Sequence, residues 1–87
     1  MKIELKKFGI VLTSRPSGKE AFAAIRPILN PNEKEILIDF DGVLSLSPSW
    51  ADEFFSALRQ MYGNKIKYLP SDNLSVKETL KILKENN

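Results

Sequence analysis

The chain has 87 residues and a net charge of +2, and 43% of its residues are apolar, which is typical of one soluble globular domain spanning residues 1–87. Its 13 Lys and Arg residues are spread along the sequence instead of forming a basic face, so we expect no nucleic-acid partner. Because cysteine and histidine are absent, disulfides, zinc sites and histidine-based acid–base catalysis are excluded. No apolar run approaches the roughly 20 residues of a membrane span. The first residues also lack the apolar segment of a signal peptide, so we expect a cytoplasmic protein without a membrane partner.

The N-terminal third predicts one or two strands followed by a helix. Apolar and charged residues alternate over 2–6, which indicates a half-buried strand. Residues 8–12 either continue this strand past a bend or form a second, paired strand, and the sequence leaves both open. In the helix that follows, Ser17 and Glu20 have the spacing of a capping box. Pro27 is expected to kink or shorten that helix near its end.

The central stretch predicts a buried strand, a polar loop and a long helix. Residues 36–38 are a short apolar run, and the acidic loop after them reaches Ser47 and Pro48. Serine suits a helix N-cap and proline suits the first helical position, so the helix is expected to begin there. Gly63 is a plausible stop. The apolar residues that recur at helical spacing in between are Trp50, Phe54, Leu58 and Met61.

The C-terminal third predicts a short strand over 65–69 and a last helix, in which Ser75 and Glu78 resemble a second capping box. The element order is therefore β(β)αβαβα, which indicates an α/β domain with a mixed, mostly parallel sheet of about four strands and about three helices. Such sheets bind ligands beyond the carboxyl ends of their strands, near helix N-termini. The loop over 39–49 lies at such an end, and we expect function there.

Three segments of the chain carry a family resemblance: residues 12–15 with Gly18, residues 38–43, and residues 46–54. They resemble the STAS-like domains, in particular the DUF4325 group, and more distantly the anti-sigma factor antagonists. The resemblance covers nearly the whole chain and agrees with its length and element order. In its most specific part the DUF4325 group typically shows Ser-Ser-aromatic-Ala-Asp-Glu. This chain has Ser-Pro-Ser-Trp-Ala-Asp-Glu there, in which Pro48 and Trp50 are variants.

The resemblance implies a small STAS-like domain that is not an enzyme, needs no cofactor or metal, and acts in regulation by binding a protein. In the anti-sigma factor antagonists, a serine at this helix start is phosphorylated by a partner kinase that is also the anti-sigma factor. That position falls on Ser49, the preceding acidic position on Ser47 and the following glycine on Trp50. The implied partner is an ATP-binding protein of the histidine-kinase type. Ser49 and Ser47 are the candidate phosphorylation sites, and the residues expected to contact the partner are Arg15, Asp39, Asp41, Ser47, Ser49, Trp50, Asp52 and Glu53.

The same residues also have structural explanations. Ser47 and Ser49 suit a helix cap. At a strand end, Asp39 suits the ordering of a loop by accepting hydrogen bonds from backbone N–H groups. Arg15 is expected either to pair with a carboxylate of the central helix or to contact a phosphate, and Trp50 is expected to be partly buried.

Residues 36–43 also resemble the first motif of the haloacid dehalogenase-like phosphatases, an apolar strand ending in Asp-x-Asp-Gly-Thr/Val. This second resemblance implies that Asp39 is a nucleophile and Asp41 a general acid/base, with Mg²⁺ holding the phosphate. The next two motifs would fall on Ser71 and on Lys77 or Lys81. No paired carboxylates follow later in the chain to complete the Mg²⁺ site. A third alternative is a structural subunit that forms homo-oligomers through the same apolar helix.

Overall fold

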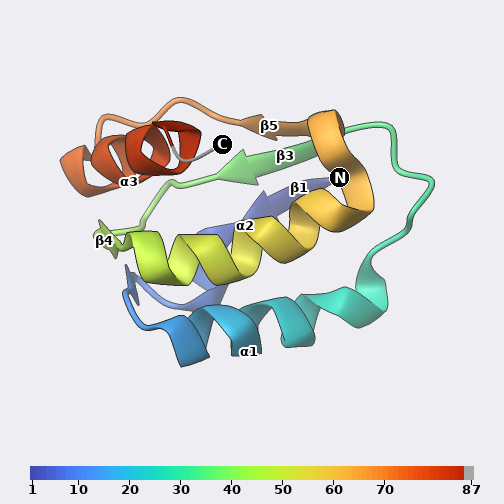
Figure 1. The fold of residues 1–87 in the computed structure, drawn as a ribbon, viewed down its shortest axis with the longest axis horizontal. Helices are drawn as coiled ribbons and strands as arrows, with labels where there is room; N and C mark the ends of the chain where they lie inside the picture. The colour runs from blue at the N-terminus through green and yellow to red at the C-terminus, as the bar shows by residue number, and fades with distance from the viewer. Residues whose placement is uncertain (86–87) are drawn as a thin grey trace.

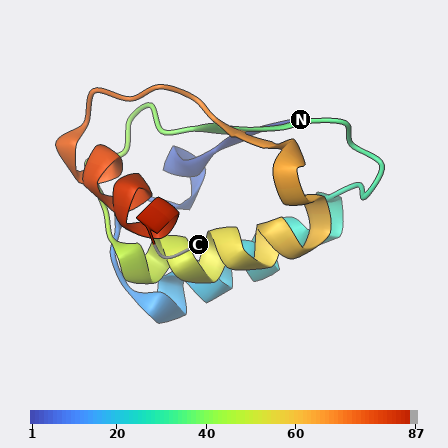
Figure 2. The ribbon, with the colours of Figure 1, turned by 45° about the horizontal axis from the view of Figure 1, so that its top comes forward.

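Two parallel sheets and three helices form the structure, a computed structural model that describes residues 1–85. The larger sheet has the order β1-β3-β5, and the smaller one pairs β2 with β4. Helices α1 and α2 pack side by side against one face of the larger sheet, and α3 lies across the end where β4 meets α2 (Figures 1 and 2). The strands are β1 (Lys2–Glu4), β2 (Val11–Leu12), β3 (Ile36–Asp39), β4 (Ser45–Leu46) and β5 (Ile66–Tyr68), and the helices are α1 (Arg15–Ile25), α2 (Pro48–Tyr62) and α3 (Leu74–Glu85).

The predicted fold class is confirmed, since strands and helices alternate and the pairing is parallel. Of the two paths left open for the N-terminal segment, the structure shows a second, paired strand, although its partner is β4 and not β1. After β1 the chain enters a 3-10 turn over Leu5–Phe8, and β2 then pairs with β4 in a separate sheet. The side chain of Leu5 is fully buried although it lies in the turn. The alternation of apolar and charged residues therefore extends beyond the end of β1. Gly9 has a φ of +130°, and this conformation lets the chain turn from the 3-10 segment towards β2.

The start and end of α2 confirm the sequence signals. The hydroxyl of Ser47 accepts a hydrogen bond from the Trp50 N–H at 3.2 Å, with Pro48 in the first helical position. Gly63 ends the helix with a φ of +57°. Pro27 shortens α1 as expected, because the α-helix stops at Ile25 and a 3-10 turn, η2 (Arg26–Ile28), follows.

The two predicted capping boxes are wrong. In α1 the cap is Ser14, whose hydroxyl accepts the Ser17 N–H at 3.1 Å. The helix can begin this early because proline, here Pro16, is tolerated in a first turn, where its missing N–H is not needed. In α3 the side chain of Asn73 accepts the Val76 N–H at 3.0 Å, although the cap was expected at Ser75.

The core is centred on the inner face of α2. Trp50, Phe54 and Phe55 are fully buried, and the Trp50 and Phe54 rings stack with centroids 4.9 Å apart. Trp50 was expected to be only partly buried; it is buried completely, and its indole packs against the rings of Phe8, Phe54 and Phe55. Helix α1 crosses α2 at the backbone of Trp50. At that crossing a Cβ on Gly18 would lie 2.5 Å from the Trp50 carbonyl oxygen, so only glycine permits this approach.

Candidate functional site

The start of α2 is held in place by the strands before it and by α3. Backbone hydrogen bonds join the Ser47 N–H to the Leu12 carbonyl at 2.9 Å, next to the parallel pairing of β2 with β4. On the other side of β4, the hydroxyl of Ser75 accepts the Leu46 N–H at 2.9 Å and donates to the Leu46 carbonyl at 3.0 Å. Thr79 also donates to that carbonyl. Ser75 therefore fastens β4 to α3, and this is the role it has in place of the predicted cap.

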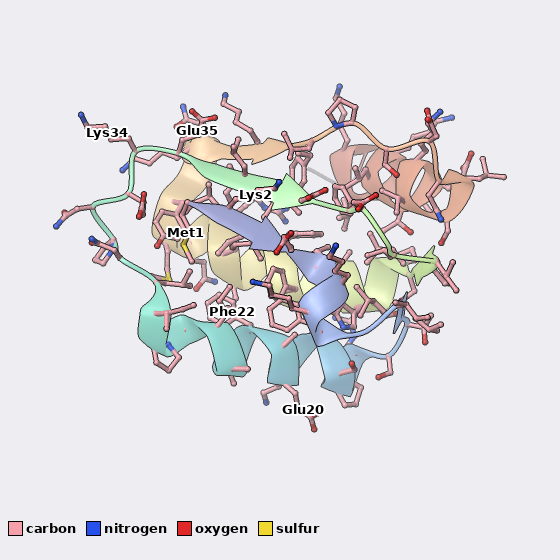
Figure 3. All side chains as sticks on the ribbon, turned by 180° about the vertical axis from the view of Figure 1, so that it is seen from behind. Met1, Lys2, Glu20, Phe22, Lys34 and Glu35 are labelled. Atoms are coloured by element: carbon pink, nitrogen blue, oxygen red, sulfur yellow. The ribbon has the colours of Figure 1, made fainter. Side chains whose placement is uncertain are left out.

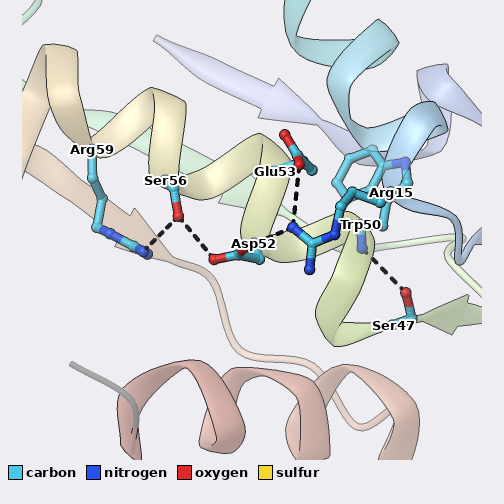
Figure 4. A network of polar contacts seen from close by, with 7 residues as sticks. All are labelled: Arg15, Ser47, Trp50, Asp52, Glu53, Ser56 and Arg59. Carbon is cyan, nitrogen blue, oxygen red and sulfur yellow. Dashed lines mark hydrogen bonds and ion pairs between the residues drawn. The ribbon is translucent and has the colours of Figure 1, made fainter.

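A chain of polar contacts runs along the outer face of α2 (Figure 4). Arg15 donates to the Asp52 carboxylate at 2.8 Å and to the Glu53 carboxylate at 3.2 Å. Ser56 donates to Asp52 at 3.1 Å, and Arg59 donates to Ser56 at 3.3 Å. We call these five residues the polar ladder. Of the two roles expected for Arg15, the structure shows the ion pair, and it involves both carboxylates.

Arg15 and Asp52 of the polar ladder are both charged at neutral pH. The hydrogen bond from Arg15 lowers the pKa of Asp52 below its usual range, and the Ser56 hydroxyl adds to this effect. The carboxylates of Asp52 and Glu53 in turn raise the pKa of Arg15. About half of the Arg15 and Asp52 side chains is exposed to solvent, 52% and 50%, so these charges are accessible from outside.

Ser49 lies beside the polar ladder, in a cleft of about 310 Å³ that lies between α2 and α3. Within residues 1–85 its hydroxyl makes no hydrogen bond, whereas the Ser47 hydroxyl donates to the Thr13 carbonyl at 2.7 Å and also caps the helix. Of the two candidate serines, Ser49 is thus the one whose hydroxyl is not committed to the fold. The residues that line this cleft are Arg15, Pro48, Ser49, Asp52, Ser56, Arg59, Ile82 and Leu83.

Asp39 and Asp41 belong to a different cleft, of about 340 Å³, beyond the carboxyl ends of β3 and β5. The Asp39 carboxylate accepts the Asp41 N–H at 3.0 Å and lies 3.3 Å from the Lys2 ammonium. The backbone N–H first, and Lys2 after it, lower the pKa of Asp39. Asp41 is exposed and lies 3.8 Å from the Lys6 ammonium. Asp39 therefore orders the loop after β3, which was its expected structural role.

Comparison with known proteins identifies the family. The sequence profile of a STAS-like domain of unknown function (DUF4325) matches residues 17–75, a segment that contains β3, β4, α2 and β5. The chain belongs to this family. No match was found among the curated proteins or among the solved structures. Membership of a STAS-like family favours the interpretation that this domain is not catalytic.

The structure of this STAS-like domain brings together part of the phosphatase-like set. Asp39, Asp41 and Ser71 line the same cleft, whereas Lys77 and Lys81 are exposed on α3 and do not line it. Within residues 1–85 no group of three or more acidic side chains is placed to hold a metal ion, so the carboxylate set that would bind Mg²⁺ is not assembled. In the same part of the chain, no helix is long and apolar enough to cross a membrane.

The residues expected to contact a partner therefore divide into three groups. Ser49 and three members of the polar ladder (Arg15, Asp52 and Glu53) lie together on one side of the STAS-like domain, with Ser47 just before them. Asp39 and Asp41 line the second cleft. Trp50 is in the core, with its indole N–H buried and without a partner in residues 1–85, so it offers no surface to another protein.

Sequence reasoning missed a group of exposed apolar side chains next to the start of α2. Ile10 is 50% exposed, Val11 58%, Leu44 64% and Leu74 70%, and we call these four residues the apolar end patch. They come from three segments that hydrogen bonds hold side by side: the Leu44 N–H donates to the Ile10 carbonyl at 2.8 Å, and Asn73, next to Leu74, donates to the Leu44 carbonyl at 3.1 Å. No periodic pattern revealed them, because β2 and β4 are each only two residues long.

Proposed function

We propose that this STAS-like domain is a regulatory module that binds another protein through the start of α2 and the apolar end patch beside it. The apolar end patch is the observation that carries the proposal. Its four large side chains are each at least half exposed, on a chain whose other large apolar residues are mostly buried. Large apolar side chains exposed on neighbouring segments of a small protein are typical of sites where another molecule docks.

The polar ladder would give this surface its specificity. Arg15, Asp52 and Glu53 present both signs of charge at the first two turns of α2, and charges at the rim of an interface determine which partner is accepted. In the STAS-like anti-sigma factor antagonists the partner is an ATP-binding protein of the histidine-kinase type. We propose a partner of that class here.

Phosphorylation of Ser49 by that partner would switch the interaction. A phosphate there adds about two negative charges at a helix N-terminus, where free N–H groups and the helix dipole favour an anion. It would also stand in the same cleft as Arg15 and Asp52, so it would attract the first and repel the second. The free hydroxyl of Ser49 supports this position over Ser47.

Binding measurements with a purified partner of this class test the surface. We expect Leu74→Asp to weaken binding by about tenfold or more, since it places a charge in the apolar end patch. Ile28→Asp is the matched control, because Ile28 is 69% exposed but lies on η2, outside the patch. Normal binding by Leu74→Asp and Leu44→Asp, each folded, would show that the surface is wrongly assigned.

Intact-mass analysis with site mapping, on protein isolated from its own host, tests the switch. An acid-stable phosphate on Ser49 is the expected result. An acid-labile phosphate on Asp39 would instead favour the phosphatase, the second candidate, which the shared cleft of Asp39, Asp41 and Ser71 supports. In that case phosphate release should disappear in Asp39→Asn.

A further inference from the structure

β1 forms one edge of the larger sheet, and within residues 1–85 no strand pairs with its outer side. The Met1 carbonyl accepts the Leu37 N–H at 2.8 Å, so the backbone groups of Met1 and Ile3 point towards β3. Because alternate residues of a strand point their N–H and C=O groups in opposite directions, those of Lys2 and the N–H of Glu4 point away from the sheet. Such an edge is a template for another strand.

An apolar groove runs beside this edge, between β1 and α1 (Figure 3 shows this side of the molecule). It has a volume of about 180 Å³ and includes Phe8, Ala24 and Ile28 in its lining. The side chain of Ile28 is 69% exposed. Natural sheet edges are commonly protected by a covering element. Here the edge is bordered by open apolar surface, which fits an occupant that supplies both a strand backbone and apolar side chains.

The charges of β1 indicate what this occupant is. The strand reads Lys2-Ile3-Glu4, and both charged side chains are partly exposed, 52% for Lys2 and 31% for Glu4. If a second β1 is laid antiparallel to the first about a two-fold axis at Ile3, each Lys2 lies opposite Glu4 of the other copy. Opposite charges in directly facing positions stabilise a strand pair, and a two-fold interface must be complementary to itself in this way.

We infer that two copies of this chain associate through their β1 edges, joining two three-stranded sheets into one of six strands. The Glu4 N–H of each copy would donate to the Lys2 carbonyl of the other, and the two Ile28 side chains would be covered beneath the joined edges. This dimer is independent of the proposed partner-binding function. The apolar end patch does not line the groove and would remain available to a partner.

Charge reversal tests the register. Sedimentation velocity over a concentration series, on protein without an N-terminal tag, should show a wild-type monomer–dimer equilibrium. In a dimer of K2E alone, or of E4K alone, like charges face one another at both ends of the strand pair. Each substitution should therefore raise the dimer dissociation constant by about tenfold or more. An equimolar mixture of K2E and E4K restores opposite charges only between unlike copies, so it should form heterodimers, detectable by native mass spectrometry. Each variant alone loses intramolecular ion pairs as well, and the mixture separates that loss from the contact between copies.

A pair of exposed apolar residues tests the groove. Ile28→Glu should give a monomer that keeps the circular dichroism spectrum of the wild type, whereas Leu74→Glu, at a position 70% exposed in the apolar end patch, should remain dimeric. A wild-type chain that is monomeric from micromolar to millimolar concentration overturns the inference. Mixtures of K2E and E4K that stay monomeric, or an Ile28→Glu variant that dimerises like the wild type, also overturn it. Because Leu74→Glu should affect partner binding and Ile28→Glu should not, failure of the dimer and failure of the proposed function can be told apart.

Discussion

The inner and outer faces of α2 differ in what they contribute. On the inner face Trp50, Phe54 and Phe55 are fully buried, and their rings contact one another with centroids 4.9 to 6.4 Å apart. On the outer face Asp52 and Ser56 are partly exposed and belong to the polar ladder. Buried aromatic side chains dominate folding energy, whereas exposed ion pairs add little.

This difference separates, within one helix, the residues that stabilise the fold from those of the proposed partner-binding surface. The inner face fixes where α2 lies, and hence where its first turn meets β4 and α3. The outer face can change sequence or charge at small cost in stability, so the fold can tolerate the proposed phosphate on Ser49. Substitutions on and around α2 should therefore differ widely in their effect on stability, from the largest at Trp50 to the smallest at Asp52.

Trp50 should show the largest effect. Trp50→Ala is expected to lower the free energy of unfolding by about 3–5 kcal/mol, because it leaves a cavity at the centre of the aromatic cluster. Trp50→Phe should cost less, since the buried indole N–H has no hydrogen-bond partner in residues 1–85 to lose. Urea unfolding followed by circular dichroism measures both. Gln60→Ala, exposed on the same helix, is the control and should stay within about 0.5 kcal/mol of the wild type. A comparable loss in Gln60→Ala would disprove the division between the faces.

Substitution of Gly18 should show the second largest effect, and the direction of the change in stability is informative. In an exposed helix a change from glycine to alanine stabilises by about 0.5–1 kcal/mol. Here the added Cβ would lie 2.5 Å from the Trp50 carbonyl, so Gly18→Ala is expected to destabilise by about 1–3 kcal/mol. Chemical unfolding decides the sign, with Lys19→Ala on the exposed side of α1 as control. Stabilisation by Gly18→Ala would mean that α1 and α2 are less closely packed at this crossing.

Local signals in the sequence were sufficient for most of the fold. The Ser47-Pro48 start, the Gly63 stop and the effect of Pro27 depend on neighbouring residues only, and the structure confirms all three. The predicted caps at Ser17 and Ser75 were wrong because a polar residue a few positions earlier, Ser14 or Asn73, caps the helix instead. The Ser75 hydroxyl accepts a hydrogen bond from the Leu46 N–H, 29 residues away in the sequence, and no local pattern predicts that contact.

The candidate site was only partly predictable, for the same reason. Arg15 and Asp52 are 37 residues apart, so their pairing depends on how α1 crosses α2, and the sequence could offer it only as one of two roles. The full burial of Trp50 likewise depends on a distant residue, Phe8, whose ring packs against the indole. No local sequence pattern predicts that Leu44 and Leu74 are exposed, because their exposure depends on whether distant segments of the chain pack over them.

The two serines at the start of α2 should differ in stability. Ser47→Ala removes the cap and the hydrogen bond to Thr13, and is expected to cost about 1 kcal/mol. Ser49→Ala should stay within about 0.5 kcal/mol of the wild type, because the Ser49 hydroxyl makes no hydrogen bond in residues 1–85. Thermal unfolding of the two variants side by side measures the difference. An equal loss for both would mean that Ser49 serves the fold, and it would weaken Ser49 as a site for modification.

Asp52 should show the smallest effect and the clearest dependence on pH. Hydrogen bonds from Arg15 and Ser56 lower its pKa in the folded state, so the stabilisation is present above the ordinary aspartate pKa of about 3.9 and is lost as the pH falls through the lower, folded value. The melting temperature of the wild type should therefore exceed that of Asp52→Asn slightly near neutral pH, and the difference should vanish in acid. Because half of the side chain is exposed, added salt should also reduce the difference. Asp72→Asn, at an exposed residue that makes no ion pair within residues 1–85, is the control and should show no such trend. A large difference that persists in acid and in salt would mean that Asp52 supports the core through packing, and the outer face of α2 would then not be free to change.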